Sequence, residues 1–428
     1  GKQDTKLIAF NTMNTSVKAS FFIKSDTHQT QNTRWAAACM AVAMALGGCS
    51  STSQRPLTPS VPPVAPPTAP AEPVVWDADV AQAMAWADEQ PLPPPIARTR
   101  SLWQPVSWTT LPGLQRDDWH QAWHAWVRSC ERPPAVWQGI CRELRPQLLG
   151  TPASQLAWMV RNLQPYRVVN PDGTEPPGLL TGYYEPVMQA SRVRTPTHTV
   201  PLYGPPPRLA ERQPWFSRRD IDTRPDVQAQ LAGREVAWLN DPIDALILQI
   251  QGSGRVVLRD ADDSERTVRL AFAGHNGHTY QSVGRWLLDQ KAISDPSWAG
   301  IKTWAARNPE RVNDMLWSNP RTVFFREEAL SSLDAQFGPR GAQGVPLTPE
   351  RSIAVDPLSV PYGTPVWLTS SGPSAQLQRL VLAQDTGGAI TGAVRADYFA
   401  GWGEPALALV GGLKQPLKMW ALWPRQAR

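Results

Sequence analysis

The stretch RLVLAQDTGGAITGAVRADYFAGWG, residues 379–403, is the most informative part of the chain. It opens with an apolar run, Arg379–Ala383, which predicts a buried β-strand. Asp385 follows, and a Gly-Gly pair just after it indicates a tight turn that displays the carboxylate. Asp397 comes later in the stretch, between apolar and aromatic neighbours. Such surroundings raise the pKa of a carboxyl group and favour its protonated, acid-competent form.

A third aspartate, Asp356, lies in the sequence SIAVDP, residues 352–357. Each aspartate taken alone has an ordinary structural interpretation, as a turn or capping residue. The residues by themselves therefore leave Asp397 only as the best candidate acid of the three.

Working outward, short apolar or alternating runs between glycine and proline turns predict β-strands from about residue 178 onward. Their spacing suggests barrel-like sheets. One helical interval, from about 279 to 308, interrupts them. The expected strands are 198–203, 245–251, 255–259, 267–271, 323–326, 366–370, 377–384 and 417–422.

The clearest helical patterns lie between residues 76 and 165. Trp119, Trp123 and Trp126 follow the spacing i, i+4, i+7, which predicts a helix with one buried face. A stripe of this kind is more typical of a core than of a ligand site. Further helices are expected at 136–148 and 152–163.

The first 48 residues have the pattern of a lipoprotein leader. Residues 35–48, WAAACMAVAMALGG, are too short to span a membrane and fit a signal-peptide core. The following Leu-Gly-Gly-Cys resembles a lipobox and makes Cys49 the expected lipidation site; the alternative is a chance apolar run. Residues 49–75 then form a proline-rich tether. Ser50, by resemblance to lipoproteins, favours anchoring to the outer membrane of a Gram-negative bacterium, on its periplasmic face.

Charge argues against nucleic-acid binding. The net charge is +5, but the leader contains five of the 42 Lys/Arg and two of the 37 Asp/Glu, which leaves +2 for the rest. The Gly-Ser-Gly at 252–254 lacks the glycine spacing of a nucleotide loop. His275 and His278 have no third ligand nearby in sequence, so we expect neither a metal nor a cofactor.

Two cysteines outside the leader and lipobox, Cys130 and Cys141, form an even pair in an oxidising compartment. We expect a disulfide, which would stabilise the fold by about 2–3 kcal/mol on the chain-entropy model. The alternative is two unpaired buried cysteines.

The combined motifs resemble the membrane-bound lytic murein transglycosylase A family. The last two matching segments correspond to a 3D domain, named for three aspartates, and Asp356, Asp385 and Asp397 occupy those places. The matching segments are LLTGYYEPV (179–187), DALILQIQGSG (244–254), FAGHNGHTYQSVGRWL (272–287), NPRTVFFRE (319–327), VPLTPERSIAVDPLSVPYGTPVWL (345–368) and the opening stretch.

This resemblance implies a mainly β fold with N-terminal helices. A double-psi β-barrel domain would combine residues 76–184 with residues 321–428. A smaller β-barrel, residues 185–320, would be inserted between these two parts, with a groove between the domains.

The resemblance also implies a peptidoglycan lytic transglycosylase, in which Asp397 is the catalytic acid and base. Asp385 would orient Asp397, while Asp356 would support the site or simply stabilise a turn. We expect a monomer that acts on glycan strands, and association with cell-wall synthases or scaffold proteins stays open. Aromatic rings suit sugar faces and amides suit hydroxyl groups, so the expected glycan-binding residues are Tyr183, Tyr184, Gln249, Gln251, Gly252, Ser253 and Gly254.

Two alternatives compete with this interpretation. A hydrolytic glycosidase would need a second carboxylate across the groove, for which Glu185 is the best candidate. A non-catalytic peptidoglycan-binding lipoprotein would keep the aromatic and amide segments, but it would not need an acid among apolar residues.

Overall fold

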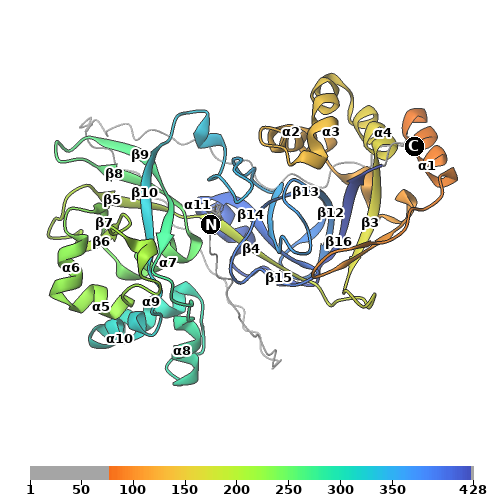
Figure 1. Ribbon diagram of the computed structural model, residues 1–428. Helices are drawn as coiled ribbons and strands as arrows, with labels where there is room; N and C mark the ends of the chain where they lie inside the picture. Colours follow the sequence, from red (N-terminus) through yellow and green to blue (C-terminus); the bar gives the residue numbers. More distant parts are fainter. Residues whose placement is uncertain (1–76, 426–428) are drawn as a thin grey trace, which may run out of the picture. The chain divides into compact units, whose positions relative to one another are not determined.

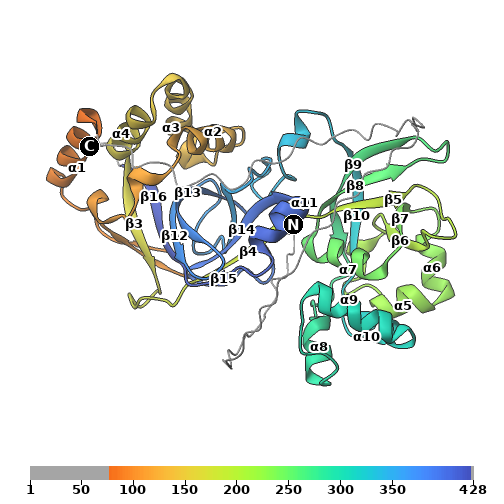
Figure 2. The same ribbon diagram turned by 180° about the vertical axis from the view of Figure 1, so that it is seen from behind.

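The computed structural model describes residues 77–425, which contain two β-sheets and the helices that flank them (Figures 1 and 2). The expected leader, the lipidation site Cys49 and the whole of the expected tether lie outside the described residues. Within residues 77–425, no helix combines the length and the apolar character that crossing a membrane requires. The mainly β fold with N-terminal helices is confirmed, whereas the double-psi arrangement and the groove stay predictions.

The larger sheet has ten strands in the order β1-β2-β3-β16-β12-β13-β11-β14-β4-β15, so it combines the first and last parts of the described chain. Most neighbours are antiparallel, but the β11–β13 and β14–β4 pairs are parallel. The strands are β1 (Ile96–Ala97), β2 (Leu102–Pro105), β3 (Leu163–Val169), β4 (Leu179–Glu185), β11 (Ser352–Val355), β12 (Pro365–Ser371), β13 (Gln376–Asp385), β14 (Arg395–Trp402), β15 (Lys414–Gln415) and β16 (Lys418–Pro424).

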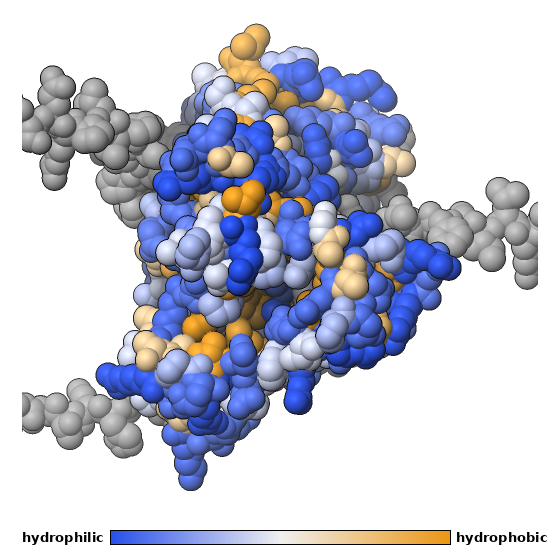
Figure 3. All heavy atoms as spheres, turned by 90° about the vertical axis from the view of Figure 1, so that its left-hand side faces the viewer, coloured by the Kyte–Doolittle hydropathy of each residue, from blue (hydrophilic) through white to orange (hydrophobic). Residues whose placement is uncertain are grey.

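The smaller sheet has six strands in the order β10-β9-β8-β5-β7-β6, and its two edge strands β10 and β6 contact each other, so it forms a nearly closed barrel. Because β10 pairs with β9, this sheet extends past residue 320, the end expected for the insert. The surface on this side is mostly hydrophilic (Figure 3). The strands are β5 (Val187–Ser191), β6 (Val200–Tyr203), β7 (Glu235–Leu239), β8 (Gly254–Arg259), β9 (Glu265–His275) and β10 (Val323–Ala329).

In the described part of the chain, four α-helices precede β3, six lie between strands of the smaller sheet, and one follows β14. The α-helices are α1 (Ala78–Glu89), α2 (Trp119–Ser129), α3 (Gln138–Leu144), α4 (Pro152–Asn162), α5 (Arg218–Thr223), α6 (Pro225–Leu231), α7 (Pro242–Gln251), α8 (Val283–Asp289), α9 (Trp298–Arg307), α10 (Val312–Trp317) and α11 (Gly403–Val410). Short 3-10 helices cover Trp108–Thr110, Leu114–Arg116, Ala135–Trp137, Arg145–Leu149, Leu209–Glu211, Pro309–Arg311 and Asp334–Gln336.

The tryptophan stripe of α2 is part of the core, as its spacing predicts. Trp119, Trp123 and Trp126 are all buried, and Trp119 stacks on Trp367 of β12 at a centroid distance of 5.8 Å. Asp118 caps the helix by accepting a hydrogen bond from the Gln121 amide. The stripe therefore attaches the helical layer to the larger sheet.

The predicted strand at 245–251 is wrong, because these residues form most of α7. Asp241 caps this helix, Pro242 occupies its first position, and Gly252 ends it in the left-handed conformation with φ 80°. The helix is buried on almost all sides. A continuous apolar run of this kind does not distinguish a buried strand from a buried helix, and here the capping residues carry the information.

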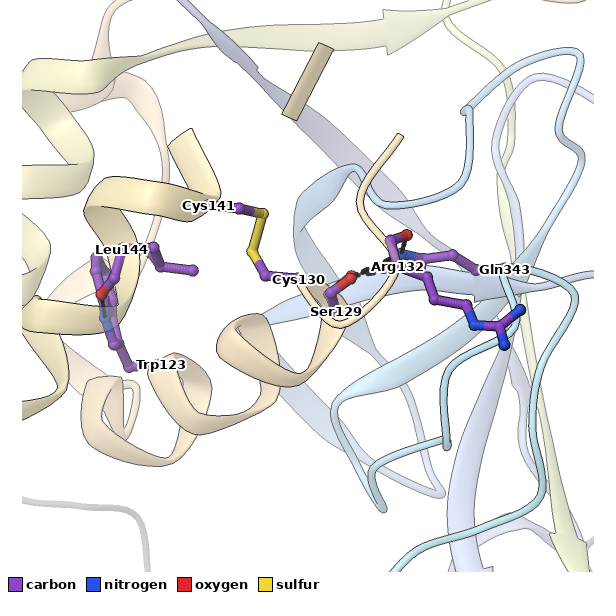
Figure 4. Close-up of a disulfide and its surroundings, with 7 residues drawn as sticks. All are labelled: Trp123, Ser129, Cys130, Arg132, Cys141, Leu144 and Gln343. Carbon is purple, nitrogen blue, oxygen red and sulfur yellow. Dashed lines mark hydrogen bonds between the residues drawn. A yellow bond between two sulfur atoms is a disulfide. The ribbon is translucent and has the colours of Figure 1, made fainter. Parts of the chain in front are cut away.

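Cys130 and Cys141 form a disulfide between the end of α2 and α3, with Cα atoms 5.5 Å apart (Figure 4). The adjoining turn is held by Gln343, whose side-chain amide donates to the carbonyl oxygens of Ser129 and Arg132 at 3.0 and 3.3 Å. The disulfide therefore closes a turn that also contacts the segment leading into β11.

Candidate active site

The strand register aligns Asp385, Ala354, Asp397 and Thr181 in one row across four neighbouring strands. Ala354 of β11 pairs with Asp385 of β13 on one side and with Asp397 of β14 on the other, and Asp397 pairs with Thr181 of β4. Directly opposed residues share a face of a sheet. The register thus places both aspartates on the same face, although 216 positions separate Asp397 from Thr181.

Asp397 is buried, with 1% of its surface exposed, and accepts a 2.7 Å hydrogen bond from the Thr181 hydroxyl. Arg395 lies two residues earlier on β14, and its Nη1 donates to Thr181 Oγ1 at 2.9 Å. Burial lowers the pKa of Arg395, and the negative charge of Asp397 opposes that shift. A donor backed by a cation therefore stabilises the anionic form of Asp397.

Asp385 is fully buried and accepts hydrogen bonds from the Tyr183 hydroxyl at 2.9 Å and from the Ala342 backbone amide at 3.1 Å. Burial, together with the charges of Asp385 and Asp397, raises the pKa of Tyr183 well above its ordinary value. Tyr183 consequently remains a proton donor. Each oxygen of Asp385 thus has a fixed partner within the protein.

An apolar cluster lies against this row; of the residues that bracket Asp397 in the sequence, Phe399 belongs to it, whereas Ala396 and Tyr398 belong to another core cluster. The rings of Tyr183 and Phe399 have centroids 5.3 Å apart. Two further members, Leu347 and Ile390, come from loops outside the strands. The cluster consists of Tyr183, Leu347, Ala354, Ile390 and Phe399.

Asp356 binds differently from the other two aspartates. Its carboxylate accepts hydrogen bonds from Arg100 Nη1 at 2.8 Å and from the amides of Leu358 and Gly392 at 3.0 and 2.8 Å. These contacts join the turn after β11 to the loop before β14. The geometry favours the turn-stabilising alternative for Asp356.

The residues expected to bind glycan have partners inside the protein. Gln249 accepts hydrogen bonds from Arg218 at 2.7 Å and from the Val323 amide at 3.3 Å, while Gln251 accepts one from the Tyr184 amide at 3.3 Å. Gly252 ends α7, and a Cβ at Gly254 would lie 2.2 Å from Leu248. These glycines therefore serve conformation and close packing.

Glu185, the candidate second carboxylate, is the centre of a buried ion cluster. It receives hydrogen bonds from Arg255 Nε at 3.1 Å, from Arg269 Nε at 2.8 Å and from the Ser253 hydroxyl at 2.7 Å. Arg255 also lies 3.6 Å from the centre of the Trp402 ring. The charge of Glu185 is compensated and its oxygens are occupied, which is unfavourable for a catalytic base.

Two parts of the chain match family models. Residues 179–326 match the MltA specific insert domain and residues 351–423 match the 3D domain. In sequence, the chain is 31% identical over 254 residues to membrane-bound lytic murein transglycosylase A of Escherichia coli K12; the match covers 56% of this chain and 64% of that protein. The chain thus spans less than two thirds of the length of that relative.

Solved structures are similar over almost their whole length. The lytic transglycosylase LtgG of Burkholderia pseudomallei is 41% identical, with a TM-score of 0.55, and the match covers 78% of this chain and 97% of that structure. The chain belongs to the MltA family. MltA from Neisseria gonorrhoeae is 27% identical with a TM-score of 0.66, and that match covers 79% of this chain and 97% of the other.

The sequence analysis missed two residues of the hydrogen-bond network around Asp397, Thr181 and Arg395. Both lie in the segments that carry the family resemblance, and each shares a face with an expected site residue two positions away, Tyr183 or Asp397. The alternation of faces along a strand, with residues two positions apart on the same face, was therefore the available signal. Only the register between β4 and β14 shows that Thr181 lies opposite Asp397.

Proposed function

We propose that the chain is a peptidoglycan lytic transglycosylase that cleaves the β-1,4 bond between N-acetylmuramic acid and N-acetylglucosamine. The observation that carries this proposal is the environment of Asp397: a buried carboxyl group among apolar side chains, with Thr181 as a hydrogen-bond donor. Such a group can exchange a proton in both directions. Membership of the MltA family supports the same reaction.

In the proposed reaction Asp397 starts protonated and donates its proton to the glycosidic oxygen, which leaves with N-acetylglucosamine. Positive charge develops at C1 of the muramic acid. The 6-hydroxyl of the same sugar attacks C1, and the anionic Asp397 accepts its proton. The product is a 1,6-anhydro sugar, and the acid is regenerated. Because the nucleophile is tethered, much of the entropic cost is avoided, and acid–base help typically contributes 10²–10⁴-fold.

The neighbours of Asp397 suit this cycle. The Thr181 hydroxyl, backed by Arg395, stabilises the carboxylate after it has released its proton. Asp385, which is held in place by Tyr183 and the Ala342 amide, would help to orient Asp397 on the same face of the sheet. These roles need one titrating carboxyl group and neither a cofactor nor a metal.

A hydrolase that uses Glu185 is the weaker alternative, because two arginines and a serine occupy its carboxylate. Mass analysis of the products released from purified sacculi distinguishes the two reactions, since a hydrolysed muropeptide is one water heavier than an anhydro-muropeptide. Release of the hydrated product alone would overturn the proposal. Release of neither product would favour a peptidoglycan-binding lipoprotein.

We further propose that glycan strands contact the segments around Tyr183 and Gln251, and that lipidation at Cys49 anchors the chain to the outer membrane. Relatives named membrane-bound lytic murein transglycosylase A support the anchoring. Labelling with a radioactive fatty acid, with Cys49→Ala as the control, tests the site of lipidation.

Asp397→Asn should fold like the parent chain and lose nearly all release of anhydro-muropeptides, a loss of at least about 10²-fold, because an amide cannot supply the proton. Mass analysis of digested sacculi measures the loss, and thermal unfolding checks the fold. Asp385→Asn is the companion variant and should impair turnover less. Normal turnover by Asp397→Asn would refute the assignment, and an unfolded Asp385→Asn would make Asp385 purely structural.

A further inference from the structure

A small cavity lies where α5, the end of α7 and the segments before β10 meet. Its volume of about 10 Å³ is room for one water-sized group. Four of its seven lining residues have charged or amide side chains. The lining residues are Arg218, Gln249, Ile250, Tyr280, Asn319, Arg321 and Val323.

Two buried arginines line this cavity; Asp222 partly compensates the charge of Arg218, whereas Arg321 has no negatively charged partner among residues 77–425. Arg218 donates to the carbonyl oxygens of Asn319 and Arg321 and to Gln249 Oε1, all neutral acceptors. Arg321 Nη1 donates to the His278 carbonyl oxygen, while its Nη2 has no hydrogen-bond partner in the part of the chain that the structure describes. Each arginine is 8% exposed. A buried charge without compensation is costly, so the guanidinium of Arg321 would favour an anionic group at this wall.

The charges persist at neutral pH. Burial lowers the pKa of both Arg218 and Arg321 to about 10, which still leaves them protonated. Burial also raises the pKa of Tyr280, so its hydroxyl remains a donor at the same wall. The two amide oxygens of the lining already accept hydrogen bonds, Gln249 Oε1 from Arg218 and Asn319 Oδ1 from the backbone amides of Gln281 and Arg321. The cavity therefore offers N–H and O–H donors and positive charge.

The positive charge and the hydrogen-bond donors at the cavity determine which kind of chemical group could bind there. A cation would be repelled, and a neutral carbonyl group would leave the positive charge uncompensated. A carboxylate can place one anionic oxygen in a water-sized space and form charge-assisted hydrogen bonds.

We propose that this cavity is a subsite for a carboxylate group of the peptide attached to N-acetylmuramic acid. The inference rests on the proposed function, because the sugar rings of the strand are neutral and its carboxylates lie on the peptide substituents. The cavity is connected to the aspartate row through α7: Gln249 lines the cavity, and Gln251 binds the amide of Tyr184, next to Tyr183. A strand held at both places would present its peptide to the smaller sheet.

Thermal unfolding of the whole chain with soluble ligands tests the subsite. The probes are N-acetylmuramyl-L-alanyl-D-glutamate, its methyl ester without free carboxyl groups, sodium acetate and sodium chloride at equal ionic strength. The muramyl peptide and acetate should raise the Tm, and the ester and chloride should not. Arg321→Gln should weaken the apparent affinity about tenfold to a hundredfold, and Arg326→Gln, an exposed arginine on β10, should leave it unchanged.

His275 provides a second readout by NMR titration. The charge of Arg321 contributes to the low pKa of His275, so a carboxylate bound beside Arg321 should raise that pKa. Should Arg321→Gln not fold, Tyr280→Phe keeps the charge, removes one donor, and should weaken binding several-fold.

Four outcomes would overturn the subsite: no response to the muramyl peptide, an equal response to its ester or to chloride, a response to acetate alone, or unchanged affinity in both folded variants. Response to acetate alone would identify a site for free small carboxylates. Failure of sacculus cleavage alongside intact peptide binding would refute the proposed function and leave the subsite standing.

Discussion

At the scale of single residues, Asp397 depends on partners that are distant in the chain. Thr181 and Asp397 are 216 positions apart, and Tyr183 and Asp385 are 202 apart. Composition near Asp397 predicted the apolar surroundings but not the hydroxyl donor. A local pattern reports on neighbouring positions, whereas the acidity of a buried carboxyl group is set by whatever the sheet places beside it.

His275 should make the protein less stable in mild acid. Its Nδ1 accepts a hydrogen bond from the Gly277 amide at 2.9 Å, and burial together with the charge of Arg321 lowers its pKa to about 4. Between about pH 6.5 and 4 the unfolded chain therefore binds a proton that the folded chain does not, and stability falls as the pH falls. His275→Asn, which keeps an acceptor, should lose this contribution.

Urea unfolding at pH 7.5 and 5.0 measures the effect. The stability of His275→Asn relative to the parent should improve by about 1 kcal/mol on acidification, since the ring is only partly shielded from solvent. His198→Asn serves as the control. An identical pH dependence in the parent and His275→Asn would contradict the prediction.

At the scale of elements, the disulfide joins two short helices, α2 and α3, which are also connected by the hydrogen bond from Trp123 Nε1 to the Leu144 carbonyl oxygen. Replacing both Cys130 and Cys141 by serine should lower the free energy of unfolding by about 2–3 kcal/mol, because the unfolded chain regains the freedom of the closed loop. Chemical denaturation measures this loss. Treatment of the parent with a reducing agent should reproduce it, and equal stability with and without the bond would contradict the expectation.

The same turn reaches the aspartate row. Gln343 binds the carbonyl oxygens of Ser129 and Arg132 beside the disulfide, and the preceding amide, that of Ala342, binds Asp385. The double serine variant should therefore also reduce anhydro-muropeptide release, in proportion to how far this turn relaxes.

Seven of the eight strands predicted from the sequence are present, but nine of the sixteen strands in residues 77–425 were not predicted, and neither was the strand pairing. Runs such as 377–384 and the tryptophan stripe of α2 have clear periods, and their elements were confirmed. The run 245–251 was assigned to the wrong element because it is apolar on all sides. For the site, the motifs gave Asp385 and Asp397, but Thr181 and Arg395 required the register, which depends on tertiary packing.

At the scale of the whole molecule, the Glu185 cluster links the two sheets. Glu185 ends β4 of the larger sheet, while Arg255 and Arg269 belong to β8 and β9 of the smaller one. Glu185→Gln leaves two buried arginines undercompensated and should cost about 3 kcal/mol. We expect the single unfolding transition of the parent to become two, as the sheets lose their electrostatic connection.

Calorimetry, with one peak or two, measures this outcome. Glu265→Gln is the matched control, because Glu265 forms an exposed ion pair with Arg259 on the same two strands and should cost at most about 1 kcal/mol. Equal costs for the two variants would show that Glu185 contributes no more than a surface pair.

The strand spacing sets the distances between the residues of the row Asp385, Ala354, Asp397 and Thr181. Neighbouring strands lie about 4.8 Å apart. Because β11 lies between the two aspartates, their backbones are separated by about two strand spacings across the sheet. A retaining hydrolase needs its carboxyl groups about 5–5.5 Å apart, which is close to one strand spacing. An aspartate at position 354 would have that spacing from Asp397. Ala354 has only a methyl group, so the residue directly between the two aspartates provides no second carboxylate next to Asp397.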